Sequence, residues 1–217
     1  TIIVDGQSQN RDGEAQLAYT NTIEAVWHSS GHFDVVEGLH AQGYGSVTNV
    51  SHHRRCIFVR GAGLWILVDT LLSVDATTHT YRQVWNFPPY KTDSGQAIYG
   101  FDEHEVVVDQ AGRCIYTVDA DTAATPNVFL YTYGEAVTYE KYYGNLDPCY
   151  GWYARGLGDG IPAVDVHAVF SGSGDRQLLT LIEPVKGTNS AITSIGDAGG
   201  GLIRGFDAET TQGHAVS

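Results

Sequence analysis

Short strand-like runs, each closed by a turn signal, follow one another along the whole chain. Three long ones are consecutive and cover residues 53–60, 64–72 and 77–87. No apolar repeat of helical period separates the runs, and short strands spaced by Gly, Pro, Asn or Asp turns are typical of packed antiparallel sheets. The sequence therefore predicts an all-β, antiparallel β-sandwich. The remaining runs lie at residues 1–4, 23–28, 33–39, 105–108, 114–118, 128–133, 164–170 and 177–182.

The length and composition predict a single domain. A chain of 217 residues with 42% hydrophobic content can bury a large core. Its 26 glycines and 13 tyrosines favour turns and pleated surfaces over helix. We expect one sandwich over residues 1–206, and a frayed tail or link over residues 207–217, which have little apolar surface to bury. Residues 134–162 are rich in Gly, Tyr, Asn, Asp and Pro, and we expect a long loop there.

The net charge excludes several kinds of partner. With 12 Lys and Arg against 25 Asp and Glu, the formal charge is −13, which argues against nonspecific binding to nucleic acid or to an anionic membrane.

No apolar run reaches the length of a transmembrane helix. The three cysteines form neither a disulfide framework nor a zinc motif. We expect no cofactor and no metal site.

The densest cationic patch is residues 52–55, His-His-Arg-Arg. Strand period puts His53 and Arg55 on one face and His52 and Arg54 on the other. One interpretation is that His53 and Arg55 point inward and pair with a carboxylate such as Asp69, because buried charges need partners. Arg54 would then meet solvent, a neighbouring domain or an anionic sugar, whose carboxylate or sulfate suits the guanidinium fork.

The order of several segments resembles a known family. Over residues 1–185 it is similar to the C-terminal β-domain of heparinase II/III-like polysaccharide lyases. The segments are Thr-Ile-Ile-Val-Asp-Gly-Gln at 1–7, residues 33–38, Gly43-Tyr44, His53 and Arg55, residues 64–69, Trp-Asn-Phe-Pro at 85–88, Pro148, Gly151-Trp152 and residues 180–184.

The resemblance implies an activity and a partner. Members of the family cleave uronate-containing polysaccharides such as alginate or glycosaminoglycans by β-elimination, normally with an (α/α) toroid ahead of the β-domain. A secreted or periplasmic location, an acidic polysaccharide substrate and an upstream toroid are therefore expected. The family's catalytic groups, and a characteristic His-Asn pair, would fall before Thr1, so no catalytic residue is assigned here. The alternative is a noncatalytic carbohydrate-binding or structural module.

Four residues are candidates for contact with substrate. Gln9 and Arg11 lie in a polar loop after the first strand, at the end of the domain that faces the toroid in the family; the alternative is a plain hairpin loop. Trp152, in a Gly-rich segment, can stack on a sugar ring or pin the loop by packing. Arg54 is the fourth.

Two further patterns have structural interpretations. His28, His32 and Asp34 offer metal-binding atoms, but the turn signal Ser30-Gly31 separates them, so a metal site is not favoured. The other three tryptophans, Trp27, Trp65 and Trp85, fall in strands and are expected in the core.

Overall fold

The fold is a two-layer β-structure. A computed structural model describes the backbone of residues 1–10, 23–89, 91–93, 96–98, 100–119, 125–156, 159–197 and 206–210. The strands are β1 (Ile2–Val4), β2 (Ile23–Ser29), β3 (Phe33–His40), β4 (Val50–Val59), β5 (Leu64–Ser73), β6 (Thr78–Phe87), β7 (Lys91–Asp93), β8 (Gln96–Ile98), β9 (Val106–Asp109), β10 (Cys114–Thr117), β11 (Pro126–Tyr133), β12 (Thr138–Tyr143), β13 (Asn145–Leu146), β14 (Cys149–Tyr150), β15 (Trp152–Gly156), β16 (Asp159–Pro162), β17 (Val164–Ser173), β18 (Arg176–Lys186), β19 (Ile192–Asp197) and β20 (Phe206–Thr210).

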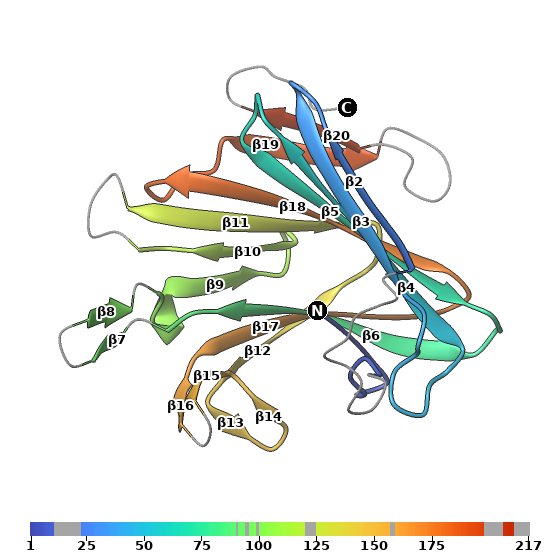
Figure 1. The fold of residues 1–217 in the computed structure, drawn as a ribbon. Helices are drawn as coiled ribbons and strands as arrows, with labels where there is room; N and C mark the ends of the chain where they lie inside the picture. The colour runs from blue at the N-terminus through green and yellow to red at the C-terminus, as the bar shows by residue number, and fades with distance from the viewer. Residues whose placement is uncertain are drawn as a thin grey trace.

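Two unequal antiparallel sheets form the layers (Figure 1). The larger has eight strands in the order β2-β3-β4-β5-β18-β11-β10-β9, and the smaller has four in the order β1-β6-β17-β12. One short 3-10 helix, Glu103–Glu105, precedes β9. The described residues contain no helix long and apolar enough to span a membrane. The prediction of an antiparallel β-sandwich is confirmed.

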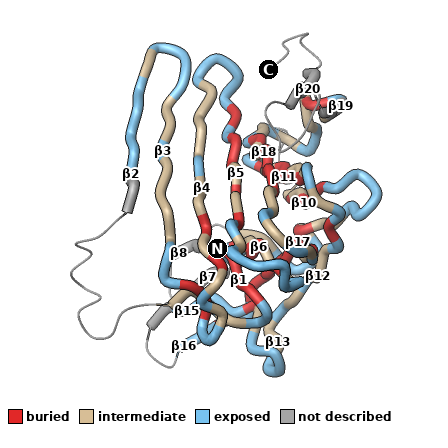
Figure 2. Tube along the Cα trace, turned by 90° about the vertical axis from the view of Figure 1, so that its right-hand side faces the viewer, coloured by how far each residue is buried: buried red, intermediate tan, exposed pale blue. Residues whose placement is uncertain are grey.

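The core fills the space between the two sheets. Alternation places one face of each strand inward, so that Leu71 and Leu178 of the larger sheet meet Tyr81 and Phe170 of the smaller one. A second inter-sheet cluster includes Phe87, Val166 and Leu130. Buried positions accordingly run along the strands where the two layers overlap (Figure 2). This overlap holds the smaller sheet against the middle of the larger one.

The strand β5 is central, as its apolar character on both faces predicts. It pairs with β4 on one side and β18 on the other. Leu71 faces the small sheet, whereas Leu64 and Ile66 point to the opposite face of the larger sheet. There they pack with Leu179 and Leu181 of β18 and with Ile192 and Ile195 of β19. The larger sheet is thus covered on both faces at its centre.

Residues 134–162 contain more pairing than the sequence predicts. The segment holds β12, an edge strand of the small sheet, followed by the two ribbons β13–β14 and β15–β16. The Gly and Tyr content suggested a loop, but ribbons this short depend on tight turns, which glycine supplies: Gly144 and Gly151 both have positive φ. Residues 206–210 form β20, so pairing extends past residue 207; residues 211–217 lie outside the described part.

Two of the three strand tryptophans are not core residues. Trp27 is 70% exposed and Trp65 is 38% exposed, while Trp85 is half-buried against an inter-sheet cluster. The expectation of core packing was wrong for Trp27 and Trp65, because β2 to β5 extend beyond the smaller sheet and their inner face is only partly covered. Strand period alone predicts the face of a residue but not the width of the layer opposite.

The two faces of β5 predict a contrast in stability. Leu71 is fully buried between the sheets and Leu72 is 38% exposed on the next position. We expect Leu71→Ala to lower the free energy of unfolding by about 2–5 kcal/mol, the cost of a cavity in a packed core, and Leu72→Ala by under about 1 kcal/mol. Urea denaturation of both variants tests this. Equal losses would show that the smaller sheet does not cover Leu71.

Candidate functional site

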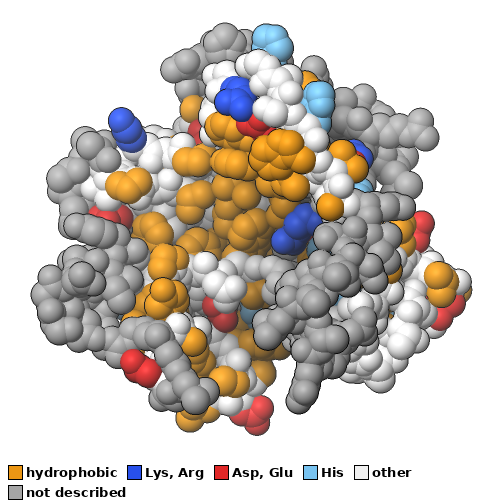
Figure 3. Space-filling model, in the orientation of Figure 1, with side chains coloured by type: hydrophobic (Ala, Val, Ile, Leu, Met, Phe, Trp, Pro, Cys, Tyr) orange, Lys and Arg blue, Asp and Glu red, His pale blue; other side chains and the backbone are white. Residues whose placement is uncertain are grey.

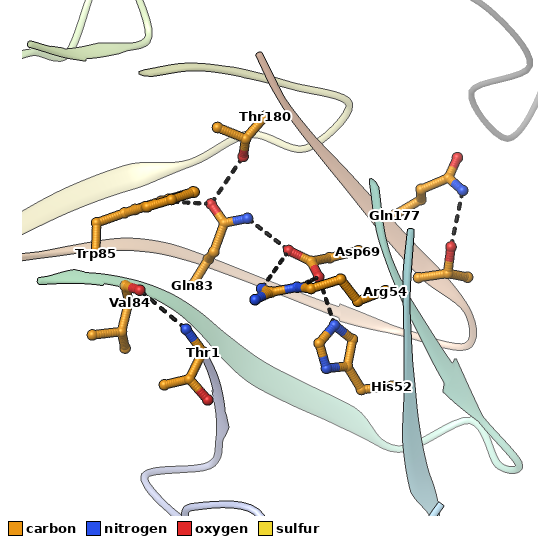
Figure 4. Close-up of polar contacts among 10 residues, drawn as sticks. Thr1, His52, Arg54, Asp69, Gln83, Val84, Trp85, Gln177 and Thr180 are labelled. Atoms are coloured by element: carbon orange, nitrogen blue, oxygen red, sulfur yellow. Dashed lines mark hydrogen bonds and ion pairs between the residues drawn. The ribbon is translucent and has the colours of Figure 1, made fainter. Parts of the chain in front are cut away.

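A buried carboxylate lies at the junction of the two sheets. Asp69 of β5 is 0% exposed, and its oxygens accept four hydrogen bonds (Figure 4). Nε2 of His52 lies 2.6 Å from Oδ1. Arg54 donates from Nε to Oδ1 at 2.6 Å and from Nη2 to Oδ2 at 3.0 Å, and Gln83 of β6 donates to Oδ2 at 2.7 Å. Register explains the arrangement, because Arg54 is directly opposite Asp69 in the β4–β5 pair.

The amide of Gln83 extends this network across the core. Its oxygen accepts a hydrogen bond from Thr180 of β18 at 3.0 Å and another from the indole of Trp85 at 2.8 Å. Gln83 and Thr180 are both 0% exposed. The network therefore joins β4, β5 and β18 of the larger sheet to β6 of the smaller one through side chains alone. We call Asp69, His52, Arg54 and Gln83 the Asp69 cluster.

The environment fixes the charges of the Asp69 cluster. Burial by itself would raise the pKa of Asp69, but the hydrogen bonds from His52 and Arg54, together with the Arg54 charge, hold that pKa well below its usual range. Burial lowers the pKa of His52, against the opposing effect of Asp69. The cluster is thus an ionised carboxylate, a guanidinium and a neutral imidazole, with no net charge.

The start of the sequence lies beside this cluster. The Thr1 amino group donates to the carbonyl oxygen of Val84 at 3.2 Å. Arg54 and Asp69 both lie within electrostatic range of the Thr1 nitrogen. The side chain of Arg54 is 33% exposed, so the guanidinium is the part of the cluster that solvent reaches.

The assignment of the two arginines to opposite faces is confirmed, but their roles are exchanged. Arg54 and His52 point between the sheets and bind Asp69, whereas Arg55 lies on the outer face and pairs with Glu37 at 2.7 Å, with 48% of its side chain exposed. His53 also lies near Glu37, at 3.5 Å. The expectation that Arg55 and His53 point inward was wrong, because period two separates the faces without saying which one the other sheet covers.

Three of the four candidate substrate residues, Gln9, Arg54 and Trp152, lie in the described part of the chain. Gln9 forms an isolated bridge with Tyr44, and Arg11 lies outside the described residues. Trp152 is in β15, where its indole donates to the Asn145 carbonyl at 2.7 Å while 37% of the residue stays exposed. The contacts of Trp152 belong to the ribbons after β12, and those of Arg54 to the inter-sheet space. Both interpretations of Trp152, stacking and packing, remain compatible with this position.

The possible metal ligands have other partners. Asp34 pairs with Arg60 at 2.7 Å and accepts a hydrogen bond from Ser29 at 2.6 Å. His28 instead contacts the ring of Phe33. Within the described ranges, no group of three or more His, Cys, Asp or Glu side chains is arranged to hold a metal ion.

A second polar group lies on the outer face of the small sheet. His167 of β17 is 0% exposed, and neither of its ring nitrogens has a hydrogen-bond partner. Its ring contacts Tyr142 and Tyr150, with centroids 5.0 and 4.5 Å away. Nearby, Glu140 pairs with Arg82 and accepts a hydrogen bond from Tyr142. Burial lowers the pKa of His167 to about 4, against the carboxylate of Asp165, so the imidazole is neutral at pH 7.

Sequence reasoning missed Gln83, Thr180 and His167. A signal existed for Gln83, because period two places it between Tyr81 and Trp85 on the inward face of β6. A polar side chain at such a position needs a buried partner. Thr180, within an apolar run, gives the same signal more weakly. His167 occupies an outward position of β17, where a polar residue is ordinary, and nothing in the sequence shows that β13–β14 covers it.

An apolar surface adjoins the Asp69 cluster. The inner face of β2 to β5 extends beyond the small sheet and leaves Trp27, Val36 and Trp65 exposed, at 70%, 41% and 38%. Trp65 stacks obliquely on Phe58 of β4, with ring centroids 4.6 Å apart. On this side of the molecule, hydrophobic side chains gather in a continuous patch (Figure 3). We call Trp27, Val36, Phe58 and Trp65 the uncovered apolar face.

Comparison with solved structures finds the same fold in larger proteins. Heparan sulfate lyase HepC from Pedobacter heparinus matches 100% of this chain with a TM-score of 0.69 at 13% identity, and a HepC mutant matches with 0.68 at 14%. A heparinase III matches all of the chain with 0.66 at 13% identity. The chain spans less than a third of the length of each, 29% of HepC. No family model and no curated protein matches the sequence.

These likenesses establish the fold. The expected resemblance to the β-domain of heparinase-like lyases is confirmed at that level, since the match extends over the entire chain. At 13–14% identity the match assigns no catalytic residue.

The Asp69 cluster predicts that the two neighbouring arginines differ strongly in stability. Arg54→Ala leaves a buried carboxylate without its main counter-charge and should lower the free energy of unfolding by about 3–5 kcal/mol. Arg55→Ala removes a partly exposed ion pair and should cost under about 1 kcal/mol. Chemical denaturation of both variants measures the contrast. A larger loss for Arg55→Ala would contradict the observed faces of β4.

Burial of neutral His167 predicts a loss of stability in mild acid. Its folded pKa, about 4, lies below the ordinary 6.5, so the unfolded chain binds the proton first and stability falls as the pH drops from about 6.5 towards 4. The contribution at about pH 5 is roughly 2 kcal/mol. Urea denaturation at about pH 7.5 and 5 should show a smaller acid loss for His167→Leu than for the unchanged protein.

Exposed His104 provides the control for this measurement. His104→Leu should retain the pH dependence of the unchanged protein, and buried His52 contributes in the same direction to every variant that keeps it. If His167→Leu loses as much stability in acid as the unchanged protein, the imidazole is not held neutral by burial.

Proposed function

We propose that this chain is the β-domain of a secreted or periplasmic polysaccharide lyase that cleaves uronate-containing acidic polysaccharide by β-elimination. Most of the catalytic groups would be supplied by residues outside this sequence. The observation that supports the proposal is the match of the whole chain to about 29% of a heparan sulfate lyase. Because the chain corresponds to only part of such a longer protein, we expect it to act together with the remaining part.

The chemistry explains why the chain needs a partner. β-Elimination requires neutralisation of the uronate carboxylate, a base that removes the proton on C5, and an acid that protonates the leaving oxygen. In the Asp69 cluster, the one solvent-accessible cation is already held by a carboxylate, and burial keeps His52 from contacting substrate freely. The cluster can therefore supply at most one of the three groups that β-elimination requires.

Arg54 is the residue that we propose for that function. A guanidinium has five N–H donors, and Asp69 accepts only from Nε and Nη2 of Arg54. The donors on Nη1 stay available to a sugar carboxylate, while Asp69 fixes the plane of the group. Because Thr1 lies beside Arg54, a His-Asn pair joined to Thr1 would enter the same space.

The uncovered apolar face supports an additional domain. Single exposed apolar residues are ordinary, whereas a contiguous exposed patch marks a contact surface. Trp27, Val36, Phe58 and Trp65 adjoin the strands that hold Arg54. We propose that an upstream (α/α) toroid packs there, so that the cleft between the two domains passes over the Asp69 cluster.

The alternative function is a noncatalytic carbohydrate-binding or structural module. The pairing of Arg54, Arg55 and Arg82 with carboxylates favours it, because such pairs also occur in purely structural domains. The sequence that precedes Thr1 in the complete protein separates the two functions. A His-Asn pair and an upstream helical domain favour the lyase.

The division of catalytic groups predicts that the 217-residue chain alone is inactive. We expect no increase in the ultraviolet absorbance of unsaturated uronate when the chain is incubated with alginate, heparan sulfate, chondroitin sulfate or hyaluronan. The complete protein should produce that absorbance with at least one of them. Robust turnover by the chain alone would contradict the proposed division, and an inactive complete protein would favour the noncatalytic module.

A further inference from the structure

The turn between β9 and β10 presents a cation that pairs with no side chain in the described part of the protein. Arg113 is exposed and takes part in none of the described ion pairs or side-chain hydrogen bonds, in contrast to Arg54, Arg55, Arg60, Arg82 and Arg176, which all pair with carboxylates. Lys141 donates to two backbone carbonyls. Among the cationic side chains that the structure describes, only Arg113 and Lys186 are left without such a partner.

Backbone contacts hold Arg113 in place. Gly112 donates to the Asp109 side chain at 2.9 Å, and the Thr132 amide donates to the Arg113 carbonyl at 2.9 Å. A Cβ at Gly112 would lie 2.4 Å from Asp109 Oδ2, so a larger residue there would have to displace the Asp109 side chain. Arg113 itself has φ 51°, a conformation that costs free energy for a residue with a side chain and that occurs preferentially at functional sites. The chain thus keeps an arginine where glycine would be easier to accommodate.

Arg113 borders an open pocket of about 480 Å³, a volume within the usual range for small-ligand sites. Tyr131 and Tyr133 of β11 form one wall, and Ile192 and Ile195 of β19 form the other. The pocket lies on the face of the larger sheet opposite the Asp69 cluster, because Tyr131 and Tyr133 pack with Leu179 and Leu181 there. In Figure 1, β19 is drawn above β18 and β11.

We propose that this pocket binds an acidic sugar unit, with Arg113 holding its carboxylate or sulfate and Tyr131 and Tyr133 contacting the ring. The guanidinium fork matches either anion with two parallel hydrogen bonds. Tyrosine rings and isoleucine side chains provide the apolar contacts that the C–H face of a sugar requires, and the tyrosine hydroxyls provide polar edges. The choice of a sugar over another small anion rests on the proposed function.

The two remaining cations make a matched test possible. Lys186 lies at the far end of the β11–β18 pair, opposite Pro126, whereas Tyr133 at the pocket is opposite Leu179. Arg113→Gln and Lys186→Gln remove the same charge from the chain, but only the first removes it from the pocket. A general electrostatic effect would change both variants equally.

The experiment is calorimetric titration of the 217-residue chain and both variants with a heparin-derived tetrasaccharide, at low and at physiological salt. We expect saturable binding, weakened about tenfold or more by Arg113→Gln and unchanged by Lys186→Gln. Arg113→Lys should recover only part of the affinity, because lysine keeps the charge without the fork. Absence of binding, or equal weakening in the two Gln variants, would overturn the proposal.

Two further ligands identify what the pocket recognises. A neutral tetrasaccharide, maltotetraose, should bind at least about tenfold more weakly than the acidic one; equal affinity would overturn the role of Arg113. Sodium sulfate should compete only at much higher concentration, and sulfate alone binding as tightly as the tetrasaccharide would overturn the sugar contact. Because these measurements involve no turnover, they fail or succeed independently of the proposed lyase activity.

Discussion

The ionised carboxylate of Asp69 constrains the whole fold. A charge with no exposed surface in the space between two sheets is strongly unfavourable unless every lone pair is satisfied. Here the four hydrogen bonds come from β4 and β6, and Gln83 passes the interaction on to β18. Hydrophobic packing alone would tolerate a small slide of one sheet over the other. The directional bonds at Asp69 admit one alignment, and the positions of Arg54, Trp85 and Thr1 follow from it.

The chain uses most of its few cations internally. It has 12 Lys and Arg for 25 Asp and Glu, and in the described part nearly every guanidinium is bound to a carboxylate. An acidic ligand consequently finds few places where charge attracts it, and those places are set by local geometry and not by the overall field. The two arginines that we propose as ligand contacts, Arg54 and Arg113, differ in their pairing. Arg54 is paired but keeps free donors, whereas Arg113 has no partner among the residues that the structure describes.

The fold was largely predictable from the sequence, whereas the site was not. Turn-bounded runs located the long strands, because period two and turn residues are local properties. Local sequence does not determine which face of β4 points inward, because that depends on which face the four-stranded sheet covers. The roles expected for Arg54 and Arg55 were therefore exchanged. The same dependence made Trp27 exposed. The short ribbons after β12 were missed because their pairing comes from two-residue contacts and glycine turns, without an apolar pattern.

The uncovered apolar face affects how the chain behaves among its own copies. Four large side chains on one face, together with β2 at the edge of the described eight-stranded sheet, would favour association between molecules. A net charge of −13 opposes it through mutual repulsion over distances of about a Debye length. The acidic composition therefore opposes self-association of a chain that exposes an apolar surface. Dissolved salt weakens that protection while leaving the face unchanged.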